Sequence, residues 1–276
     1  MNIRLQLKKL LERRQYSSDA KKYSLLLKQQ GIKNTVQLGE EQWYSKWAVL
    51  GIKPTKECYR LFSRYIGNDD KIVPEYICHH VIEQCLNPVG MVGYYTDKNM
   101  YNRLFPKEYL PATVFRYQMG GYNADYQYVG NHPDSIDEAL RNTDFRALII
   151  KPSTDTESGR GVLKAVKGDD DKWYVESKNI ILNGSFLFDF YAGRDFIIQE
   201  CVDQSDEISQ YNPTSINTLR LSVYRSVKDN KCHVTNAIMR IGGKGSYVDN
   251  AHAGGVFVGI NPDGRLCDFV CDQYGN

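Results

Sequence analysis

From about Asp97 to its end, the sequence is a series of short apolar runs, rich in Val, Ile and Tyr, that are separated by turn residues. Runs of this length, bounded by Gly, Pro, Asn and Asp, are typical of β-strands. The strands expected on this basis cover residues 147–150, 196–202, 218–227, 233–241, 255–260 and 265–270.

Two of the connections between these runs have the composition of hairpin turns. Lys228-Asp229-Asn230-Lys231 joins one pair of runs, and Asn261-Pro262-Asp263-Gly264 joins the next pair. In the second turn, proline presets φ at the second position and glycine supplies a positive φ at the end. The chain from residue 94 onward is therefore predicted to be an α+β domain with antiparallel sheets.

The first third of the chain, residues 1–93, has the pattern of helices instead. Leucines at near-helical spacing lie among lysines and arginines in residues 4–14 and 21–28, and Trp43 and Trp47 are four residues apart. The basic helix faces have two interpretations. They are solvated faces packed on the protein's own core, or they dock an anionic membrane surface or a carrier partner.

One helix is expected between the strands. Ser135-Ile136-Asp137-Glu138 has the spacing of a capping box. In that motif a serine hydroxyl and a glutamate carboxylate satisfy N–H groups at the helix N-terminus. We therefore expect a helix to begin at Ser135.

Composition limits the function classes. The formal net charge is +2, so the chain carries no global signal for a nucleic acid or another polyanion. No apolar run is long enough to span a bilayer, and the basic N-terminus lacks the apolar core and cleavage site of a signal peptide. We therefore expect a cytoplasmic protein.

The cysteines indicate a reducing compartment. Their number is 7, which is odd, and a chain of this length does not need disulfide staples. His79, His80 and Cys85 place three metal-ligating side chains in one short segment. A single cluster of this kind more often has a structural role, so the sequence predicts no metal site.

Candidate phosphate-binding residues follow the expected strand at 147–150. This strand delivers Lys151, and the loop Ser158-Gly159-Arg160-Gly161 comes shortly after it. Lysine offers a compact charge to phosphate oxygens, and glycines let backbone N–H groups approach phosphates closely. The loop is not a Walker A motif, because the lysine precedes the glycines. A hairpin that uses its glycines only to turn explains the pattern equally well.

A candidate base-binding segment comes at the end of the strand at 196–202. This strand carries Glu200 near its end, and Glu207 follows after a short excursion. The strand can present backbone groups to an adenine edge, and the second acid can reach ribose hydroxyls. Alone, the segment is also explained as a core strand with a solvated acidic end, just as an isolated Lys98 is explained as surface charge.

The order of these pieces along the chain is that of the ATP-grasp superfamily. The chain resembles this superfamily from about Tyr94 to its end, and it is most similar to the branch called sugar-transfer associated ATP-grasp. The resemblance rests on Asp97-Lys98, Lys151-Pro152, the glycine loop, Gln199-Glu200, Glu207, Pro213–Arg220, Met239–Gly242, Val248–Asn250 and Gly254-Gly255.

The resemblance implies a fold and a set of site residues. An ATP-grasp fold holds ATP between two antiparallel-sheet subdomains, which here would be residues 94–199 and 200–276. The implied phosphate-binding residues are Lys98, Lys151, Ser158, Gly159, Arg160 and Gly161. The implied adenine and ribose contacts are Glu200, Cys201, Val202 and Glu207. The implied catalytic or acceptor-binding residues are Arg220, Arg240 and Asn250. Cross-strand ion pairing on a sheet face is the alternative role for the two arginines.

The sequence departs from the family pattern near its C-terminus. ATP-grasp enzymes bind ATP with Mg²⁺, and the family's ligands include an acid and a Glu-x-Asn-like pair on the closing strands. No such pair is found here, so Mg²⁺ is expected from the resemblance but its ligands are not identified. We expect that the last strands of the fold are missing. An exposed edge or an uncovered core face would favour dimerisation or instability.

The leading functional hypothesis is an ATP-dependent carboxylate–amine (or carboxylate–thiol) ligase that acts through an acylphosphate. Its partners would be ATP and a small carboxylate or a sugar-linked acceptor, in polysaccharide or cell-surface biosynthesis. The alternatives are a phosphotransferase acting on a sugar hydroxyl, a nucleotide-binding module without catalysis, and a structural α+β protein without a ligand.

Overall fold

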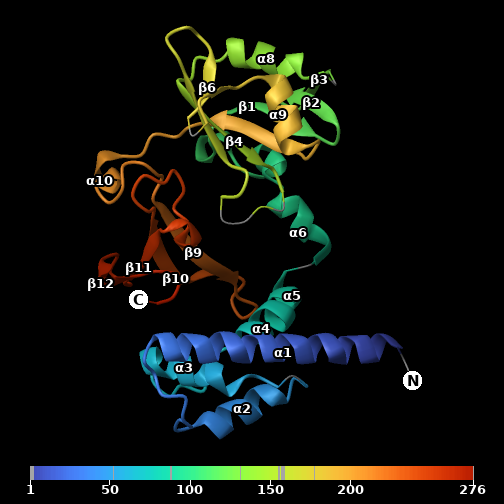
Figure 1. Ribbon diagram of the computed structural model, residues 1–276. Coiled ribbons are helices and arrows are strands. Elements are labelled where there is room, and N and C mark those ends of the chain that lie inside the picture. The colour runs from blue at the N-terminus through green and yellow to red at the C-terminus, as the bar shows by residue number, and fades with distance from the viewer. Residues whose placement is uncertain are drawn as a thin grey trace. The chain divides into compact units, whose positions relative to one another are not determined.

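The computed structural model describes residues 3–51, 53–87, 89–130, 132–154, 156, 159–176 and 178–275, of which residues 3–13 and 89 are described by their backbone alone. The described chain forms two compact units, one ending at Met91 and the other spanning Val92–Tyr274. Figure 1 shows a helical first unit and a second unit built largely of strands. Each unit is considered separately below.

The first unit is helical, as the sequence predicts. Its elements are α1 (Ile3–Gln29), α2 (Glu40–Ala48), α3 (Lys56–Ile66), α4 (Glu75–Ile77), the π-helix η1 (Cys78–Ile82) and α5 (Glu83–Leu86). The two leucine-rich basic segments belong to one continuous helix, α1, because no glycine or proline interrupts the chain before Gly31. Helix α6 (Val89–Thr96) begins in the first unit and ends in the second.

The core of the first unit gathers around Trp43 of α2. Its indole packs against the ring of Tyr59 on α3 at 5.0 Å between centroids, and its N–H donates to the carbonyl of Ile72 at 2.7 Å. Tyr23 and Leu27 of α1 complete this core. Burying an indole is favourable because its single polar atom finds a partner, and this one does.

The second unit contains an eight-stranded antiparallel sheet. Its strands are β1 (Thr113–Gln118), β2 (Gly121–Ala124), β3 (Gln127–Gly130), β4 (Ala147–Pro152), β5 (Leu163–Lys167), β6 (Trp173–Val175), β7 (Ile180–Ile181) and β8 (Phe196–Glu200). The spatial order is β3-β2-β1-β8-β4-β5-β6-β7, so β8, the last strand in sequence, pairs with both β1 and β4 near the centre.

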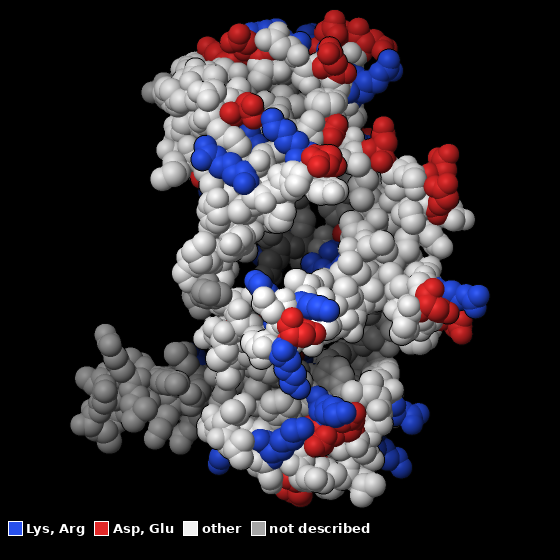
Figure 2. Space-filling model, turned by 180° about the vertical axis from the view of Figure 1, so that it is seen from behind, with Lys and Arg blue, Asp and Glu red and all other residues white. Residues whose placement is uncertain are grey.

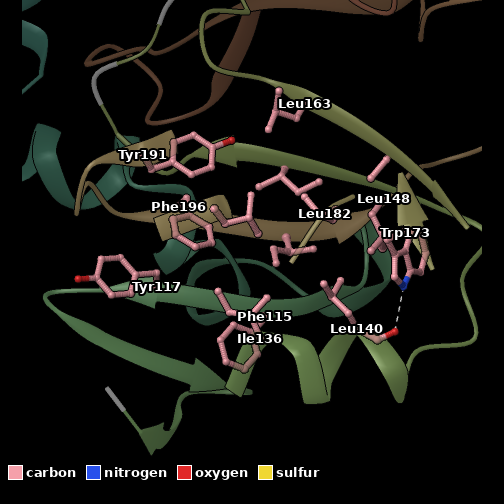
Figure 3. Close-up of a cluster of buried hydrophobic side chains, with 14 of the residues drawn as sticks. Phe115, Tyr117, Ile136, Leu140, Leu148, Leu163, Trp173, Leu182, Tyr191 and Phe196 are labelled. Atoms are coloured by element: carbon pink, nitrogen blue, oxygen red, sulfur yellow. Dashed lines mark hydrogen bonds between the residues drawn. The ribbon is translucent and has the colours of Figure 1, made fainter. Parts of the chain in front are cut away.

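Helices α8 (Asp134–Arg141) and α9 (Gly184–Tyr191) cover one face of this sheet, and the main core lies between them and the strands. Figure 3 shows Ile136 and Leu140 of α8 beside the strands of this core. The rings of Tyr117, Phe196 and Tyr191 stack in a column, with centroids 5.5 and 4.8 Å apart. The Trp173 indole N–H donates to the carbonyl of Leu140 at 3.0 Å. This contact ties β6 to the end of α8.

The helix predicted at Ser135–Glu138 is confirmed, but its capping box is wrong. Helix α8 begins at Asp134, one residue before Ser135, and its N-cap residue Pro133 makes no side-chain cap hydrogen bond. Asp137 instead accepts a hydrogen bond from the N–H of Gly184, at the start of α9, at 2.7 Å. The acidic first turn still suits the positive end of the helix dipole, and Asp137 connects α8 to the start of α9.

A second, four-stranded antiparallel sheet has the order β12-β11-β10-β9. Its strands are β9 (Thr218–Arg225), β10 (Cys232–Ile241), β11 (Val256–Ile260) and β12 (Leu266–Cys271). Both predicted hairpins are confirmed, and the positive-φ turn residues are Asn230 and Gly264. The remaining short elements are η2 (Lys98–Met100), α7 (Tyr101–Leu104), η3 (Lys107–Tyr109), α10 (Asp206–Ser209) and η4 (Ala251–Ala253).

The smaller sheet has an uncovered apolar face. Leu219, Leu221 and Val223 alternate along β9 and are 63%, 54% and 54% exposed. Leu219 pairs with Met239 of β10, which is buried on the same face. The polar residues that alternate with these side chains lie on the opposite face of β9. One face of this strand is therefore mainly apolar and the other is polar.

Charged side chains are mixed on the surface. Figure 2 shows Lys and Arg lying beside Asp and Glu over the face that it displays. None of the described helices combines the length and the apolarity that crossing a bilayer requires.

The central position of β8 leads to a prediction about the stability of the protein. Ile198 is fully buried between Phe115 of β1 and Ile150 of β4. Ile198→Ala should lower the free energy of unfolding by about 2–5 kcal/mol, because a cavity remains where the side chain was. Urea denaturation followed by circular dichroism measures this. The control Ile181→Ala, at a residue 45% exposed on the edge strand β7, should change stability far less. Equal losses in the two variants would contradict this account of the core.

Candidate functional site

The face of the large sheet opposite α8 and α9 is polar and cationic. Arg116 of β1 pairs with Ile197 of β8, which in turn pairs with Lys151 of β4. Directly paired residues in a sheet point to the same face. By the same register Gln199 of β8, Ile149 of β4 and Lys164 of β5 form the neighbouring row. Two lysines and an arginine therefore project from one side of four adjacent strands.

Lys98 lies at the end of β4, next to Lys151. Its backbone N–H and its ammonium group donate to the carbonyl of Ser153 at 3.0 and 3.2 Å. Asp97 fixes this turn by accepting the N–H of Asn99 at 2.9 Å. Burial, and then the charge of Lys98, lower the pKa of Lys151. The tertiary structure thus brings together two cations that lie far apart in the sequence, and neighbouring like charges favour binding of an anion.

The predicted glycine loop runs beside these lysines. Gly159 and Gly161 have φ of +73° and +72°, which side-chain-bearing residues adopt only with strain. A Cβ on Gly159 would come within 3.1 Å of Val248, from a loop of the smaller sheet. The Tyr191 hydroxyl donates to the carbonyl of Gly161 at 2.7 Å. The loop is therefore held close to both sheets. Arg160 is exposed, and Ser158 lies outside the described residues.

Some of the polar groups in the segment from Glu200 to Val202 already form hydrogen bonds within the protein. A carboxylate oxygen of Glu200 accepts the N–H of Ala112 at 2.7 Å, and the Cys201 N–H donates to the carbonyl of Ala147 at 3.0 Å. The Glu200 carboxylate and the Cys201 N–H are thus already engaged. Within the described part of the chain, the N–H of Val202 makes no hydrogen bond. It is the backbone donor of this segment that a ligand can reach.

A depression of about 450 Å³ lies beside this segment. It is lined by Lys164, Glu176, Pro213, Thr214, Gly245 and Tyr247. Burial raises the pKa of the Cys201 thiol, and the charges of Lys164, Asp203 and Glu176 also act on it. Lys164 forms an ion pair with Glu176 at 3.2 Å. The segment 200–202 therefore lies next to the lining of the depression. Segments of both sheets contribute residues to this lining.

Glu207 is solvent-exposed in α10. Its own backbone N–H and the hydroxyl of Ser205 lower the pKa of its carboxyl group. The side chain is thus ionised and accessible, and its present hydrogen bonds are local ones of a helix first turn.

The two candidate arginines share one face of the smaller sheet. Arg240 pairs with Thr218 in the β9–β10 ladder, and Arg220 lies two residues further along β9. Arg240 forms an ion pair with Asp249 at 2.9 Å, and the Thr218 hydroxyl donates to the same carboxylate. Arg220 is exposed and makes no ion pair with any residue that the structure describes. Of the two guanidinium groups, that of Arg220 is the accessible one.

The polar motif before β9 has a clear structural role. The side chain of Asn212 donates to the Ser215 hydroxyl at 3.0 Å and to the carbonyl of Gly243 at 3.1 Å. That of Asn217 donates to the carbonyl of Asn212 at 3.1 Å and accepts the N–H of Gly242 at 3.2 Å. These buried amides hold the loop before β9 against the loop after β10, close to Asp249 and Asn250. The carbonyl of Asn250 accepts the N–H of Gly255.

Sequence reasoning missed Arg116 and Lys164. Arg116 is only 1% exposed, donates to Asn102 at 2.5 Å, and lies 4.2 Å from the ring centroid of Tyr126. Burial lowers its pKa, and it makes no ion pair with a described carboxylate. A single Arg inside the apolar run Thr113–Tyr117, and a Lys alternating with buried residues in Leu163–Lys167, are the signals that could have revealed them.

The described acid that contacts the candidate arginine Arg240 does not offer a free carboxylate to Mg²⁺. A Mg²⁺ site takes one or two carboxylates beside the substrate's phosphates. Asp249, next to the candidate arginines, is already held by Arg240 and Thr218. Among the residues that the structure describes, the cluster of three metal-ligating side chains lies in the first unit, at Cys78, His79 and Glu83.

Comparison with known proteins gives one match. A family model described as sugar-transfer associated ATP-grasp matches residues 80–275, which is more than half of the chain. Neither the curated proteins nor the solved structures contain a significant match.

The lowered pKa of Lys151 predicts a stability effect with a defined sign. Lys151→Met should raise the free energy of unfolding near neutral pH, because a desolvated ammonium group beside Lys98 disappears. The unfolded chain titrates at the ordinary value of 10.5 and the folded chain at a lower one. Wild-type stability should therefore rise with pH through this window, and the advantage of the variant should shrink toward pH 10.5.

Urea denaturation at several pH values from about 7 to 10 measures this difference. Lys164→Met is the matched control, because it removes a lysine of the same face that already has its partner in Glu176. It should bring no gain in stability. A Lys151→Met variant that is no more stable than the wild type near neutral pH would contradict the electrostatic description of the site.

Proposed function

Because the chain belongs to the sugar-transfer associated ATP-grasp family, we propose that it binds ATP on the cationic face of its large sheet and uses it in a ligase reaction. The observation that carries this proposal is the convergence of Lys98 and Lys151 beside a loop of two positive-φ glycines. Clustered cations on a half-buried face are unfavourable alone, and a polyphosphate would compensate them.

In this proposal, Lys98 and Lys151 bind phosphate oxygens, and the loop from Ser158 to Gly161 covers them. Lysine suits this role because its ammonium group is a compact charge with three donors. The positive-φ glycines of the loop turn backbone N–H groups toward an anion. Arg160, exposed on the same loop, is available to a phosphate group when the loop closes.

The adenine would bind at the end of β8. The free N–H of Val202 supplies a donor to the base, and the backbone of Glu200 and Cys201 forms the adjoining edge. The Glu200 carboxylate acts there as a positioning group, since it is bound to the Ala112 N–H. The ionised and exposed Glu207 would accept hydrogen bonds from the ribose hydroxyls.

The proposed reaction has two steps. A substrate carboxylate oxygen attacks the γ-phosphorus of ATP, the bond from this phosphorus to the β–γ bridging oxygen breaks, and ADP leaves. An amine or thiol then attacks the acyl carbon of the acylphosphate, the carbon–oxygen bond breaks, and phosphate leaves as the nucleophile loses its proton. Arg220 would bind the acidic substrate and Asn250 would line its site. Arg240 would stabilise the transferring phosphate after exchanging its ion pair with Asp249 for one with the ligand.

Two other functions remain as alternatives. The family description refers to sugar transfer, which favours a phosphotransferase that passes the γ-phosphate to a sugar hydroxyl. The engagement of Asp249 by Arg240 favours a nucleotide-binding module without catalysis. In each case the phosphate-binding residues would be the same, and the reaction would be cytoplasmic, where ATP is abundant.

Titration calorimetry of ATP with and without Mg²⁺ tests the binding site. We expect the wild type to bind ATP with an affinity in the micromolar range. Lys151→Ala should weaken this affinity about 10–100-fold, because a charge-assisted contact contributes about 1.5–3 kcal/mol. Lys172→Ala is the control, since this lysine pairs with Asp170 in a surface turn and should leave binding unchanged. Equal affinity in wild type and Lys151→Ala would refute the proposed site.

The products distinguish the three functions. Phosphate released only when an acid and an amine or thiol are both present supports the ligase. A stable phosphorylated sugar without ligation supports the phosphotransferase. Tight binding of ATP that is independent of Mg²⁺, without turnover of any acceptor, supports the binding module.

A further inference from the structure

A cluster of three different metal-ligating side chains lies on the short helical segment 75–86 of the first unit. The Cys78 thiol, the His79 ring and the Glu83 carboxylate each place one ligand atom within 4.8 Å of the others. One oxygen of Glu83 is 3.0 Å from Nδ1 of His79 and 4.0 Å from Sγ of Cys78. His79 and Glu83 are exposed and Cys78 is half-buried, so the cluster is open to solvent.

The π-helix η1 creates this arrangement. The Glu83 N–H bonds to the carbonyl of Cys78, which is a five-residue turn in place of the usual four. In a regular α-helix Cys78 would lie below residues 81 and 82. The wider turn sets Cys78 below Glu83 instead, while His79 keeps its four-residue spacing to the same carboxylate. One inserted residue thus turns three side chains toward one point.

We propose that Cys78, His79 and Glu83 bind a zinc ion, with a fourth coordination position left to water or to an external ligand. Zinc takes sulfur, nitrogen and oxygen ligands at about 2.0–2.3 Å in a tetrahedron, which places ligand atoms about 3.3–3.6 Å apart. The observed separations of 3.0 and 4.0 Å bracket this value. The thiol and the imidazole lie within 4.8 Å of each other, so rotations of these exposed side chains that move their ends by about an ångström would bring all three ligand atoms to tetrahedral spacing.

The ligand set itself selects the class of metal. A thiol beside an imidazole favours zinc and other late first-row ions over Mg²⁺ or Ca²⁺, which prefer oxygen alone. The neighbouring acid Glu75 does not compete as a ligand, because Lys22 and Tyr23 hold its carboxylate at 2.7 and 2.6 Å. The site also falls largely outside the matched family region, since Cys78 and His79 precede residue 80.

A simpler role for the cluster is an i,i+4 ion pair between His79 and Glu83 on a helix surface. Such pairs contribute about 0.3–0.5 kcal/mol and need no thiol. The same helical segment offers matched controls that separate the two roles. The ring of His80 stacks on Tyr76 at 4.3 Å between centroids, and Cys85 is exposed and is not part of the cluster.

The test is a titration of the reduced, metal-free full chain with Co²⁺, a spectroscopic substitute for zinc. We expect one Co²⁺ per chain, with a thiolate-to-cobalt charge-transfer band and the strong visible bands of a tetrahedral site, all displaced by one equivalent of Zn²⁺. Cys78→Ser should remove the charge-transfer band. His79→Ala and Glu83→Gln should weaken the affinity for Zn²⁺ by about 100-fold or more, because even groups that only orient a ligand contribute about 10–100-fold.

The controls Cys85→Ser and His80→Ala should retain both the spectrum and the affinity. Circular dichroism of each variant without metal verifies that the helices are intact, so a lost signal reports lost ligation. Absence of the charge-transfer band in the wild type, or a band that disappears in Cys85→Ser and survives in Cys78→Ser, would overturn the proposal. ATP binding does not enter this experiment, so its result is independent of the function proposed above.

Discussion

The pairing of β8 with two strands from a distant part of the sequence is the constraint on which the second unit depends. Phe196 and Ile198 of this strand point into the core under α8 and α9, whereas Ile197 and Gln199 point to the opposite face. Side chains alternate along a strand, so a slip of one residue would exchange the two faces. The same register that buries the core therefore assembles the cationic face from β1, β4 and β5.

This cationic face is electrostatically unbalanced. Arg116 and Lys151 make no ion pair with any carboxylate in the described part of the chain, and burial lowers the pKa of both. Desolvated charges without a counter-charge oppose folding, and the core on the other side of the sheet offsets this. Such a strained charge arrangement is common at binding sites. A polyphosphate suits the face that we propose to bind ATP, because one molecule supplies several negative groups in a row.

Polar contacts hold the loops of the smaller sheet. Buried amides of Asn212 and Asn217 hold its loops, and the Tyr247 hydroxyl donates to the carbonyl of Val162, just after the glycine loop. Hydrogen bonds of this kind are directional, so they fix geometry while contributing modest stability. The two sheets of the second unit can in this way face a shared ligand while the apolar face of the smaller one remains uncovered.

The sequence alone determined the features that depend on neighbouring residues. Strand periods and turn chemistry located both hairpins, and the order of Lys98, Lys151, the glycine loop and Glu200 indicated the family that the comparison then confirmed. Tertiary structure decided what depends on distant partners. Asp137 of α8 accepts the N–H of Gly184 in α9, Lys98 reaches the carbonyl of Ser153, and Arg116 and Lys164 join one face through strand pairing. Local patterns restrict the backbone of a few residues at a time, whereas these contacts exist only after a sheet has brought together segments tens of residues apart.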